Sequence, residues 1–188
     1  MPLTVTNLLG EDAHDLRRYL QTGDDQELAR RRAVVAVSLV GIGCMAFTTL
    51  LQMGLVKDLP DPPRGNFHTK KVNSSETAYS FGGPDSPVTI IAHGVNIALA
   101  AFGGRDRADR HPWVSVLASL AAAGPAIVSA KYLFYQMPRV DKAWCPYCIT
   151  DALVHFATFA LTLPEAARAL RPSASRSLER RVRAVVRR

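Results

Sequence analysis

The residues best suited to chemistry are two closely spaced cysteines, Cys145 and Cys148, in the stretch "WCPYC". A Cys-x-x-Cys pair can cycle between dithiol and disulfide, or it can supply half of a zinc site. Pro146 suits the first turn of a helix, and a helix N-terminus favours thiolate over thiol. The spacing therefore predicts a pair at a helix start. Cys145 should be the better exposed of the two and should act as the thiol that exchanges with a partner. Cys148 should contact a molecule held inside the bundle.

Other interpretations of the pair stay open. A zinc half-site needs two more ligands, and His68 or His93 could be offered, although no spacing supports either. A thioredoxin-like fold would place the pair after a strand, whereas here an apolar run precedes it. Two structural cysteines without chemistry are the third option. Cys44, the remaining cysteine, lies within an apolar run and is interpreted as a small core residue.

Four apolar blocks must position these cysteines: residues 33–56, 87–104, 113–137 and 144–163. The first has 24 residues without a charge, enough to span ~30 Å of hydrocarbon and too long for a signal peptide. The second is short and polar in places. Pro125 should kink or loosen the third, and Pro164 should end the fourth. We predict an all-α, polytopic membrane protein with a four-transmembrane-helix bundle.

The distribution of basic residues predicts how this bundle is oriented. With the N-terminus inside, the three inner segments hold five, three and eight arginines, and the outer loops hold six Lys and Arg together. Since Lys and Arg favour the cytoplasmic side, both termini should be cytoplasmic, and the cysteine pair should lie at the extracytoplasmic face of the cell membrane. The division expected is a cytoplasmic segment 1–32, a membrane domain 33–165 and a basic tail 166–188.

Ionisable side chains within the apolar blocks are the next candidates. Cys148, Asp151 and His155 fall at i, i+3 and i+7 and should share one helix face. Lys131 should lie at a similar depth on the third helix, so an Asp151–Lys131 pair is expected. Charges at such depth usually face a partner or the interior. These residues are interpreted as a proton path or a structural pair.

A dithiol must exchange two electrons with a partner, and within a bilayer the usual two-electron partner is a quinone. This inference comes from location. His93 and Asn96, in the second block, could hydrogen-bond a quinone carbonyl, or they could bond helix to helix. Haem ligation by His93 and His155 is a weaker alternative.

The sequence resembles the vitamin K epoxide reductase family over roughly residues 33–165. Two stretches carry the resemblance: "WCPYC", and "KVNSSETAYSFGGPDSP" before the second block. In the second stretch the matching residues are Val72, Ser74, Ser75, Phe81 and Gly82. The stretch "LPDPP" at 59–63 is similar to the outer loop of divergent bacterial members.

The resemblance implies a four-helix bundle around a quinone such as menaquinone. It implies that Cys145 and Cys148 are the redox centre, supplied with electrons by an extracytoplasmic thioredoxin-like protein or small thiol. Ser75 and Phe81, with His93 and Asn96, are the candidate quinone contacts. We expect no metal. The function predicted is a quinone-linked membrane thiol–disulfide oxidoreductase.

One departure from the family pattern bears on this prediction. Typical members carry a second cysteine pair in the outer loop, but residues 57–86 contain no cysteine, and Thr69 stands where one is expected. Relay through this loop is therefore impossible. Either a partner attacks Cys145 directly, or the protein is a non-enzymatic membrane subunit or interaction protein that kept the fold.

The two ends of the chain are predicted to meet the membrane surface. Leu16, Tyr19 and Leu20 could form one turn of an interfacial helix. The tail has apolar residues at roughly helical spacing among its arginines, which suits a helix on anionic lipid. No aromatic interleaves these arginines, so membrane lipid is the expected partner and no nucleic acid is expected.

Overall fold

A computed structural model describes residues 6–171 of the chain, and every regular element within that range is helical. The longer helices are α1 (Ala13–Thr22), α2 (Gln26–Gln52), α4 (Asp85–Ala101), α6 (Pro112–Lys131) and α7 (Pro146–Ala169). The short ones are α3 (Thr69–Asn73), η1 (Glu76–Tyr79) and α5 (Arg107–Arg110), and the π-helical segment η2 (Tyr132–Asp141) continues α6.

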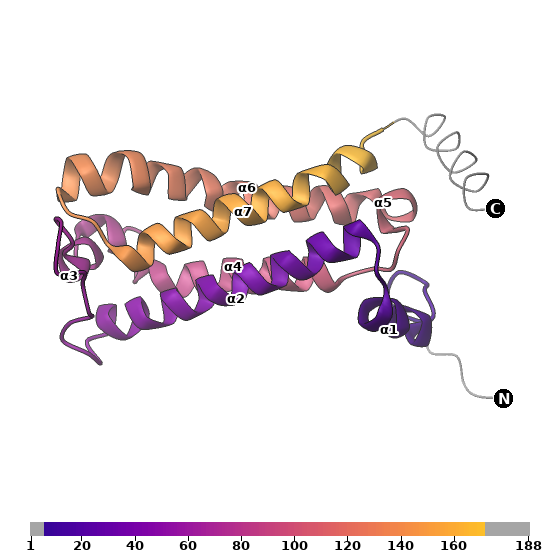
Figure 1. Ribbon diagram of the computed structural model, residues 1–188, viewed down its shortest axis with the longest axis horizontal. Helices are drawn as coiled ribbons and strands as arrows, with labels where there is room; N and C mark the ends of the chain where they lie inside the picture. Colours follow the sequence, from indigo (N-terminus) through magenta and orange to yellow (C-terminus); the bar gives the residue numbers. More distant parts are fainter. Residues whose placement is uncertain (1–5, 172–188) are drawn as a thin grey trace.

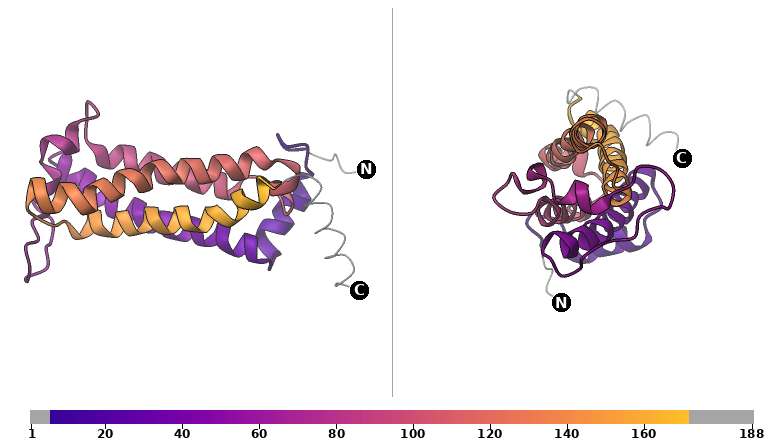
Figure 2. Two further views of the ribbon diagram at one scale, coloured as in Figure 1. Left: turned by 90° about the horizontal axis from the view of Figure 1, so that it is seen from above. Right: turned by 90° about the vertical axis from the view of Figure 1, so that its left-hand side faces the viewer.

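Four long helices lie side by side in an elongated bundle (Figures 1 and 2). Helix α2 packs against α4 and α7, and α6 packs against α7 and α4, so the four close a ring. The end of α7 and helix α1 lie at one end of the bundle, while α3 and the α6–α7 connection lie at the other (Figure 1). We call these the α1 end and the α3 end.

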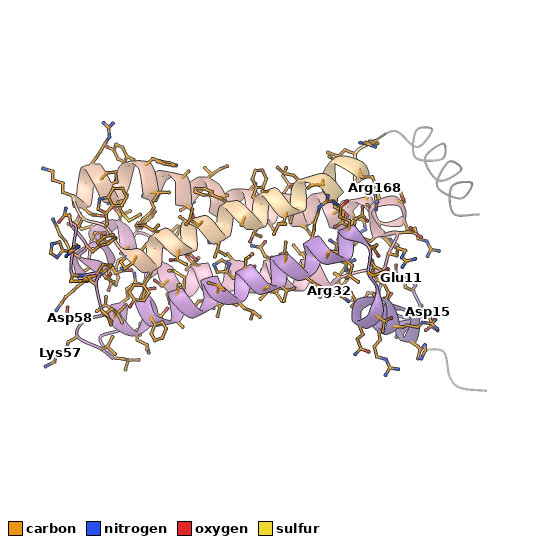
Figure 3. The ribbon with its side chains drawn as sticks, viewed as in Figure 1. Glu11, Asp15, Arg32, Lys57, Asp58 and Arg168 are labelled. Atoms are coloured by element: carbon orange, nitrogen blue, oxygen red, sulfur yellow. A yellow bond between two sulfur atoms is a disulfide. The ribbon has the colours of Figure 1, made fainter. Side chains whose placement is uncertain are left out.

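The outer surface of the bundle is apolar and its interior holds polar groups, which is the pattern of a protein surrounded by lipid. Three helices in the described part of the chain are long and apolar enough to cross a membrane: α2, α6 with η2, and α7. Exposed apolar side chains include Leu39, Phe47, Ile91, Leu120, Ile127 and Leu153, and buried polar ones include Ser38, Thr48, His93, Asn96, His155 and Thr158. The charged residues labelled in Figure 3 lie at the two ends.

The apolar blocks gave approximate helix limits, and a local contact explains the difference at the start of α2. Helix α2 begins at Gln26, before the expected 33, because the Asp25 side chain caps it by accepting the Leu28 N–H at 3.0 Å. Helix α7 continues past Pro164 to Ala169. Residues 138–143, which separate the third and fourth apolar blocks, are mostly helical, since η2 reaches Asp141 with Pro138 inside it. Residues 172–188, where a tail helix was predicted, lie outside the described residues.

Buried arginines hold the α1 end together. The Arg31 guanidinium donates to the carbonyls of Ala100 (2.6 Å) and Gly103 (2.7 Å), which end α4. Arg107 binds both carboxylate oxygens of Glu165, at 2.6 and 2.7 Å. The sequence analysis counted these arginines as cytoplasmic charges and gave them no structural partners. In the structure they bind carbonyls near the end of α4 and a buried carboxylate.

Helix α1 lies against this end, and its amphipathic turn was predicted from Leu16, Tyr19 and Leu20. The Tyr19 hydroxyl donates to Asp25 at 3.3 Å. Burial, together with the negative charge of Asp25, raises the pKa of Tyr19 to about 12. The phenol therefore stays protonated and continues to donate at any physiological pH.

Candidate functional site

The cysteine pair begins helix α7, as its spacing predicts. Cys145 is the N-cap residue and Pro146 the first helical residue, so the Cys145 sulfur accepts the Cys148 N–H at 3.1 Å. The two cysteines form a disulfide with their Cα atoms 5.2 Å apart. The expectation that Cys145 would be the better exposed is wrong: Cys145 is fully buried, and Cys148 is partly exposed.

The outer segment that precedes α3 explains the burial of Cys145. Trp144 pairs with this segment through two backbone hydrogen bonds of 2.9 Å each, Trp144 N–H to the Asn66 carbonyl and His68 N–H to the Trp144 carbonyl. The Tyr147 hydroxyl donates to the Pro60 carbonyl at 3.3 Å. The geometry of a helix terminus alone does not predict a contact between segments so distant in sequence. Here the outer segment covers the Cys145 sulfur.

Thr69 anchors the same segment. It is fully buried, and Asp61 accepts both its hydroxyl (2.6 Å) and its backbone N–H (3.0 Å). The position where the family pattern expects a cysteine therefore carries a structural hydrogen bond in this chain.

Asn73, the last residue of α3, contacts both sulfurs. Its side-chain amide donates to Cys145 at 3.4 Å and to Cys148 at 3.6 Å, and also to the Thr69 carbonyl at 2.9 Å. The sequence analysis quoted this residue within "KVNSS" but gave it no role. A buried amide N–H aimed at sulfur stabilises thiolate when the disulfide is reduced.

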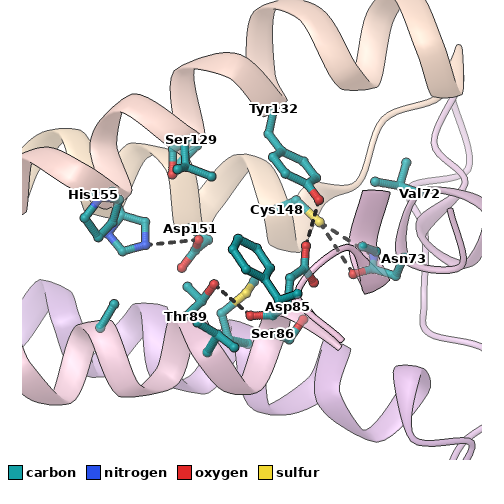
Figure 4. Close-up of a pocket in the computed structure, with 18 residues that line it drawn as sticks. Val72, Asn73, Asp85, Ser86, Thr89, Ser129, Tyr132, Cys148, Asp151 and His155 are labelled. Atoms are coloured by element: carbon teal, nitrogen blue, oxygen red, sulfur yellow. Dashed lines mark hydrogen bonds and ion pairs between the residues drawn. The ribbon is translucent and has the colours of Figure 1, made fainter. Parts of the chain in front are cut away.

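A cavity of about 180 Å³ lies beside Cys148, between α4, α6 and α7 (Figure 4). Apolar side chains form most of its wall: Met45, Val72, Ala78, Phe81, Val88, Ala92, Pro125, Val128 and Ala152. The polar lining residues are Asn73, Asp85, Ser86, Thr89, Ser129, Tyr132, Asp151 and His155. An apolar pocket with a few convergent polar groups is typical of a small-molecule site.

The exposure of some lining residues indicates that the cavity opens between α4 and α6. Three of its lining residues are exposed at the bundle surface, Phe81 by 65%, Val88 by 46% and Val128 by 46%. Val88 belongs to α4 and Val128 to α6, whose outer faces carry other exposed apolar side chains. The mouth is therefore rimmed by apolar groups at a surface suited to lipid.

Tyr132 and Asp85 form a polar pair on the cavity wall near Cys148. The Tyr132 hydroxyl donates to Asp85 at 2.8 Å, and Gln52 donates to the other carboxylate oxygen at 2.7 Å. Tyr132 is the first residue of the π-helical segment η2, and π-turns often occur at functional sites. The sequence analysis missed both residues, because Tyr132 looked like one more aromatic in an apolar run and Asp85 looked like a helix-start residue.

Asp151 and two histidines form a buried cluster at the other end of the cavity. The Asp151 carboxylate lies 2.8 Å from Nε2 of His93 and 3.4 Å from Nε2 of His155. The expected Asp151–Lys131 pair is wrong: Lys131 is exposed, and no ion pair joins it to Asp151 among residues 6–171. Helix α7 turns this carboxylate toward α4 rather than toward α6.

The other candidate quinone contacts are spread over several places. Phe81 lines the cavity, but Ser75 does not, and its hydroxyl bonds the Val72 carbonyl at 2.9 Å. His93 lies behind Asp151, outside the cavity wall. Asn96 is buried one turn further along α4, away from the cavity. Of the four, only Phe81 is on the wall.

The geometry also bears on metal and haem. His93, Asp151 and His155 offer ligand atoms within 4.8 Å of one another, and in the described part of the chain no such group includes Cys145 or Cys148. Among the described residues, no further ligands therefore complete a zinc site with the two cysteines. The rings of His93 and His155 are stacked at 4.3 Å, so no porphyrin fits between them in this arrangement.

The fold and site together define a class: an all-helical membrane protein with a disulfide at a helix start, beside a cavity that opens to the apolar surface. Residues 32–163 match the model of the Vitamin K epoxide reductase family. The match covers more than half of the chain, so the chain belongs to this family, which suggests thiol–disulfide and quinone chemistry in a membrane. No curated protein and no solved structure matches it.

Proposed function

We propose that this chain is a quinone-linked membrane thiol–disulfide oxidoreductase, which passes electrons from an extracytoplasmic dithiol through Cys145 and Cys148 to a quinone such as menaquinone. The observation that carries the proposal is that Cys148, one half of a disulfide, lines an apolar cavity whose mouth lies at the lipid-suited surface. A lipid-soluble oxidant can reach this sulfur from the bilayer.

The cavity fits the ring of a quinone better than the whole molecule. Its volume of about 180 Å³ is below the ~300–1,000 Å³ of pockets that enclose entire drug-sized ligands. The ring would lie among Cys148, Tyr132 and Asp151, and a prenyl tail would leave through the mouth between Val88 and Val128. Hydrogen-bond donors on the cavity wall are suited to bind the carbonyl oxygens of the quinone ring.

In the reaction proposed, the electrons balance over two half-reactions. A thiolate of the partner dithiol attacks the Cys145 sulfur and breaks the Cys145–Cys148 bond. The second partner thiol then resolves the mixed disulfide, leaving both cysteines reduced. Cys148 next transfers two electrons to the quinone, the disulfide re-forms, and the two thiol protons lost are matched by two protons gained in the quinol.

Local structure supports these roles for the two sulfurs. The free N–H groups at the start of α7 and the Asn73 amide both stabilise the thiolate that Cys148 must form. Cys145 is covered by the outer segment, so direct attack by a partner requires residues 60–68 to move away from Trp144. With no cysteine in residues 57–86, a thioredoxin-like or small thiol donor must act on Cys145 itself.

We also propose that all four bundle helices cross the membrane, with both termini cytoplasmic and the α3 end outside. Helix α4 has 17 residues, which gives about 25 Å at the helical rise, a little short of the hydrocarbon core. Arg31 binds the Ala100 and Gly103 carbonyls and so covers the inner end of this helix with hydrogen bonds. The membrane domain would be residues 33–165, between a cytoplasmic segment 1–32 and a basic, lipid-contacting tail 166–188.

The test is reduction of a menaquinone analogue by an added dithiol, using the purified full chain in lipid nanodiscs. We expect catalysis by the wild type and none by Cys148→Ala or Cys145→Ala. Cys44→Ala is the matched control, because Cys44 is the one cysteine outside the disulfide and should leave the rate unchanged. Equal rates for wild type and Cys148→Ala would overturn the proposal.

A second function has one observation in its favour, the closed state of the outer segment. Thr69 and Asp61 hold this segment over Cys145 by two hydrogen bonds. A membrane subunit that kept the fold without passing electrons would have this arrangement. The same experiment separates the two functions, since the subunit would give no dithiol-dependent quinone reduction with any donor that reaches the α3 end.

A further inference from the structure

His93, Asp151 and His155 form a charge cluster buried in the middle of the bundle. His93 comes from α4, and the other two lie one turn apart on α7. The side chains of His93 and His155 are 0% and 2% exposed. The two rings are stacked almost parallel, with centroids 4.3 Å apart and planes 4° apart, and each presents its Nε2 to a different oxygen of the Asp151 carboxylate.

The contacts of the four ring nitrogens indicate where protons are held in this cluster. Nδ1 of both rings is buried without a partner in the part of the chain described. Because an unpartnered buried N–H is costly, we assign the proton of each neutral ring to Nε2, which faces Asp151. That state has a net charge of −1 within a low-dielectric bundle. One further proton neutralises the cluster, whereas two would place imidazolium rings face to face at 4.3 Å. The cluster therefore holds one exchangeable proton.

The cluster borders the cavity at the end away from the disulfide. Asp151 and His155 line the cavity, and Cys148 and Asn73 lie toward its other side (Figure 4). Cys148 and His155 are seven residues apart on α7, which separates them by about 10 Å along the helix. A para-quinone carries its two carbonyls at opposite edges of the ring, so a ring lying along the cavity would turn one oxygen toward the sulfur and the other toward the cluster.

We propose that the His93–Asp151–His155 cluster stores a proton and gives it to the quinone oxygen farther from the cysteines. This inference rests on the proposed function. Of the two protons that the quinol gains, the nearer oxygen takes one from the Cys148 side, and the farther oxygen takes one from the cluster. The other thiol proton, released at the α3 end, is matched when the cluster takes a proton back, so each turnover balances.

The three residues of the cluster have different roles in the proposed proton transfer. Asp151 and His155 border the cavity and can reach a bound ring, so they are the catalytic residues. His93 is not part of the cavity wall and acts as a positioning residue through Asp151. Gly41 of α2 allows this placement, because a Cβ there would lie 2.2 Å from Nε2 of His93.

Few other charges act on the cluster from the helices around it. Helix α2 contributes the partly buried Cys44 thiol. Tyr132, at the start of η2, and Asp85 of α4 are hydrogen-bonded to each other nearer Cys148. Lys131, which ends α6, is exposed. Among the described residues, the two histidine rings are therefore the groups that lie against the Asp151 carboxylate.

A metal ion is the competing occupant, since two histidines and a carboxylate can also bind Zn²⁺. The stacking argues against this. Parallel rings direct their Nε2 lone pairs alongside each other, whereas ligands of one ion must converge on it. Metal-bound histidines also usually donate Nδ1–H to a second group, and neither Nδ1 has such a partner among the residues described.

The test uses the purified full chain in nanodiscs, pre-reduced and mixed with a menaquinone analogue in a single turnover. Asp151→Asn should slow quinol formation on the order of 100-fold and make the rate fall with rising pH between pH 6 and 8, where the wild type stays flat. His155→Gln and His93→Gln should behave alike but more mildly. Lys131→Gln, an exposed ionisable residue close by, is the matched control and should match the wild type.

A second measurement does not depend on turnover. Infrared spectra of the oxidised protein without quinone should show a carboxyl-group band that Asp151→Asn removes. Rates and spectra of Asp151→Asn equal to the wild type would overturn the inference. So would one equivalent of tightly bound zinc that Asp151→Asn loses.

Failure of the proposed function would look different. In that case the wild type, Lys131→Gln and Asp151→Asn would all form quinol no faster than Cys148→Ala, and the inference would fall with it. Should Asp151→Asn not fold, His155→Gln and its pH–rate profile decide the matter, with folding checked by thermal unfolding.

Discussion

The side-chain amide of Asn73 lies 3.4 Å from the sulfur of Cys145, although 72 positions separate the two residues in the chain. This contact joins the outer segment to the start of α7 and gives the disulfide its one side-chain hydrogen-bond donor among those described. We expect Asn73→Ala to make the disulfide harder to reduce, because the amide stabilises thiolate more than disulfide sulfur. The reduction potential should become more negative by about 30 mV.

Equilibration against glutathione buffers measures that potential. Asn96→Ala is the matched control, since Asn96 is equally buried in the bundle and its amide has no hydrogen-bond partner among the described residues. A potential for Asn73→Ala that equals the wild-type value, or lies above it, would contradict the role given to the amide.

Asp61→Ala should uncover Cys145. Its carboxylate accepts both hydrogen bonds of Thr69, so its loss weakens the attachment of the outer segment. In a background with Cys44→Ala and Cys148→Ala, the remaining thiol should react with an impermeant maleimide about tenfold faster, which corresponds to loss of a charge-assisted bond. Asp58→Ala is the control, because Asp58 pairs only with exposed Lys70. Equal alkylation rates in the two variants would show that the segment does not limit access.

Gly41→Ala and Gly43→Ala, two changes on the same helix, should have opposite effects. A Cβ at Gly41 would meet His93 at 2.2 Å, and a Cβ at Gly43 would meet nothing within 4 Å. We expect Gly41→Ala to displace the imidazole and lower the midpoint of thermal unfolding. Gly43→Ala should be neutral or stabilise by up to about 1 kcal/mol, the helix-propensity difference between the two residues. An unfolding midpoint for Gly41→Ala at or above that of Gly43→Ala would refute the close packing.

Glu165→Ala should be among the most destabilising single changes at the α1 end. It leaves the buried Arg107 guanidinium without its bidentate partner, and breaking a buried pair in this way costs about 3–5 kcal/mol. Unfolding by denaturing detergent from mild micelles measures the difference in free energy. Asp15→Ala, which removes an exposed ion pair with Arg18, serves as control and should change nothing measurable. Similar losses in both variants would mean that the Arg107–Glu165 pair contributes little.

Part of this architecture follows from local patterns in the sequence. The Cys-x-x-Cys spacing with Pro146 predicted a pair at a helix start, and the i, i+3, i+7 spacing predicted that Cys148, Asp151 and His155 share a face. The structure places all three on one cavity wall. The apolar blocks located the long helices, because a run of about 20 apolar residues is a local signal.

The remainder depends on how helices are rotated against one another, which a single sequence does not encode locally. Depth along the helices suggested Lys131 as the partner of Asp151. Depth does not show in which direction around the helix axis a side chain points, and the Asp151 side chain of α7 points toward α4. The burial of Cys145 depends on backbone pairing of Trp144 with Asn66 across the bundle end. Tyr132 lacked any signal beyond its aromatic ring.

The mouth between Val88 and Val128 has a consequence for how the site is supplied. A ligand that arrives through this opening diffuses in two dimensions, so its occupancy follows its mole fraction among the lipids and not its aqueous concentration. Apparent affinities measured in nanodiscs should therefore scale with the amount of lipid present. Truncated, water-soluble analogues should saturate the site poorly even when their ring contacts are unchanged.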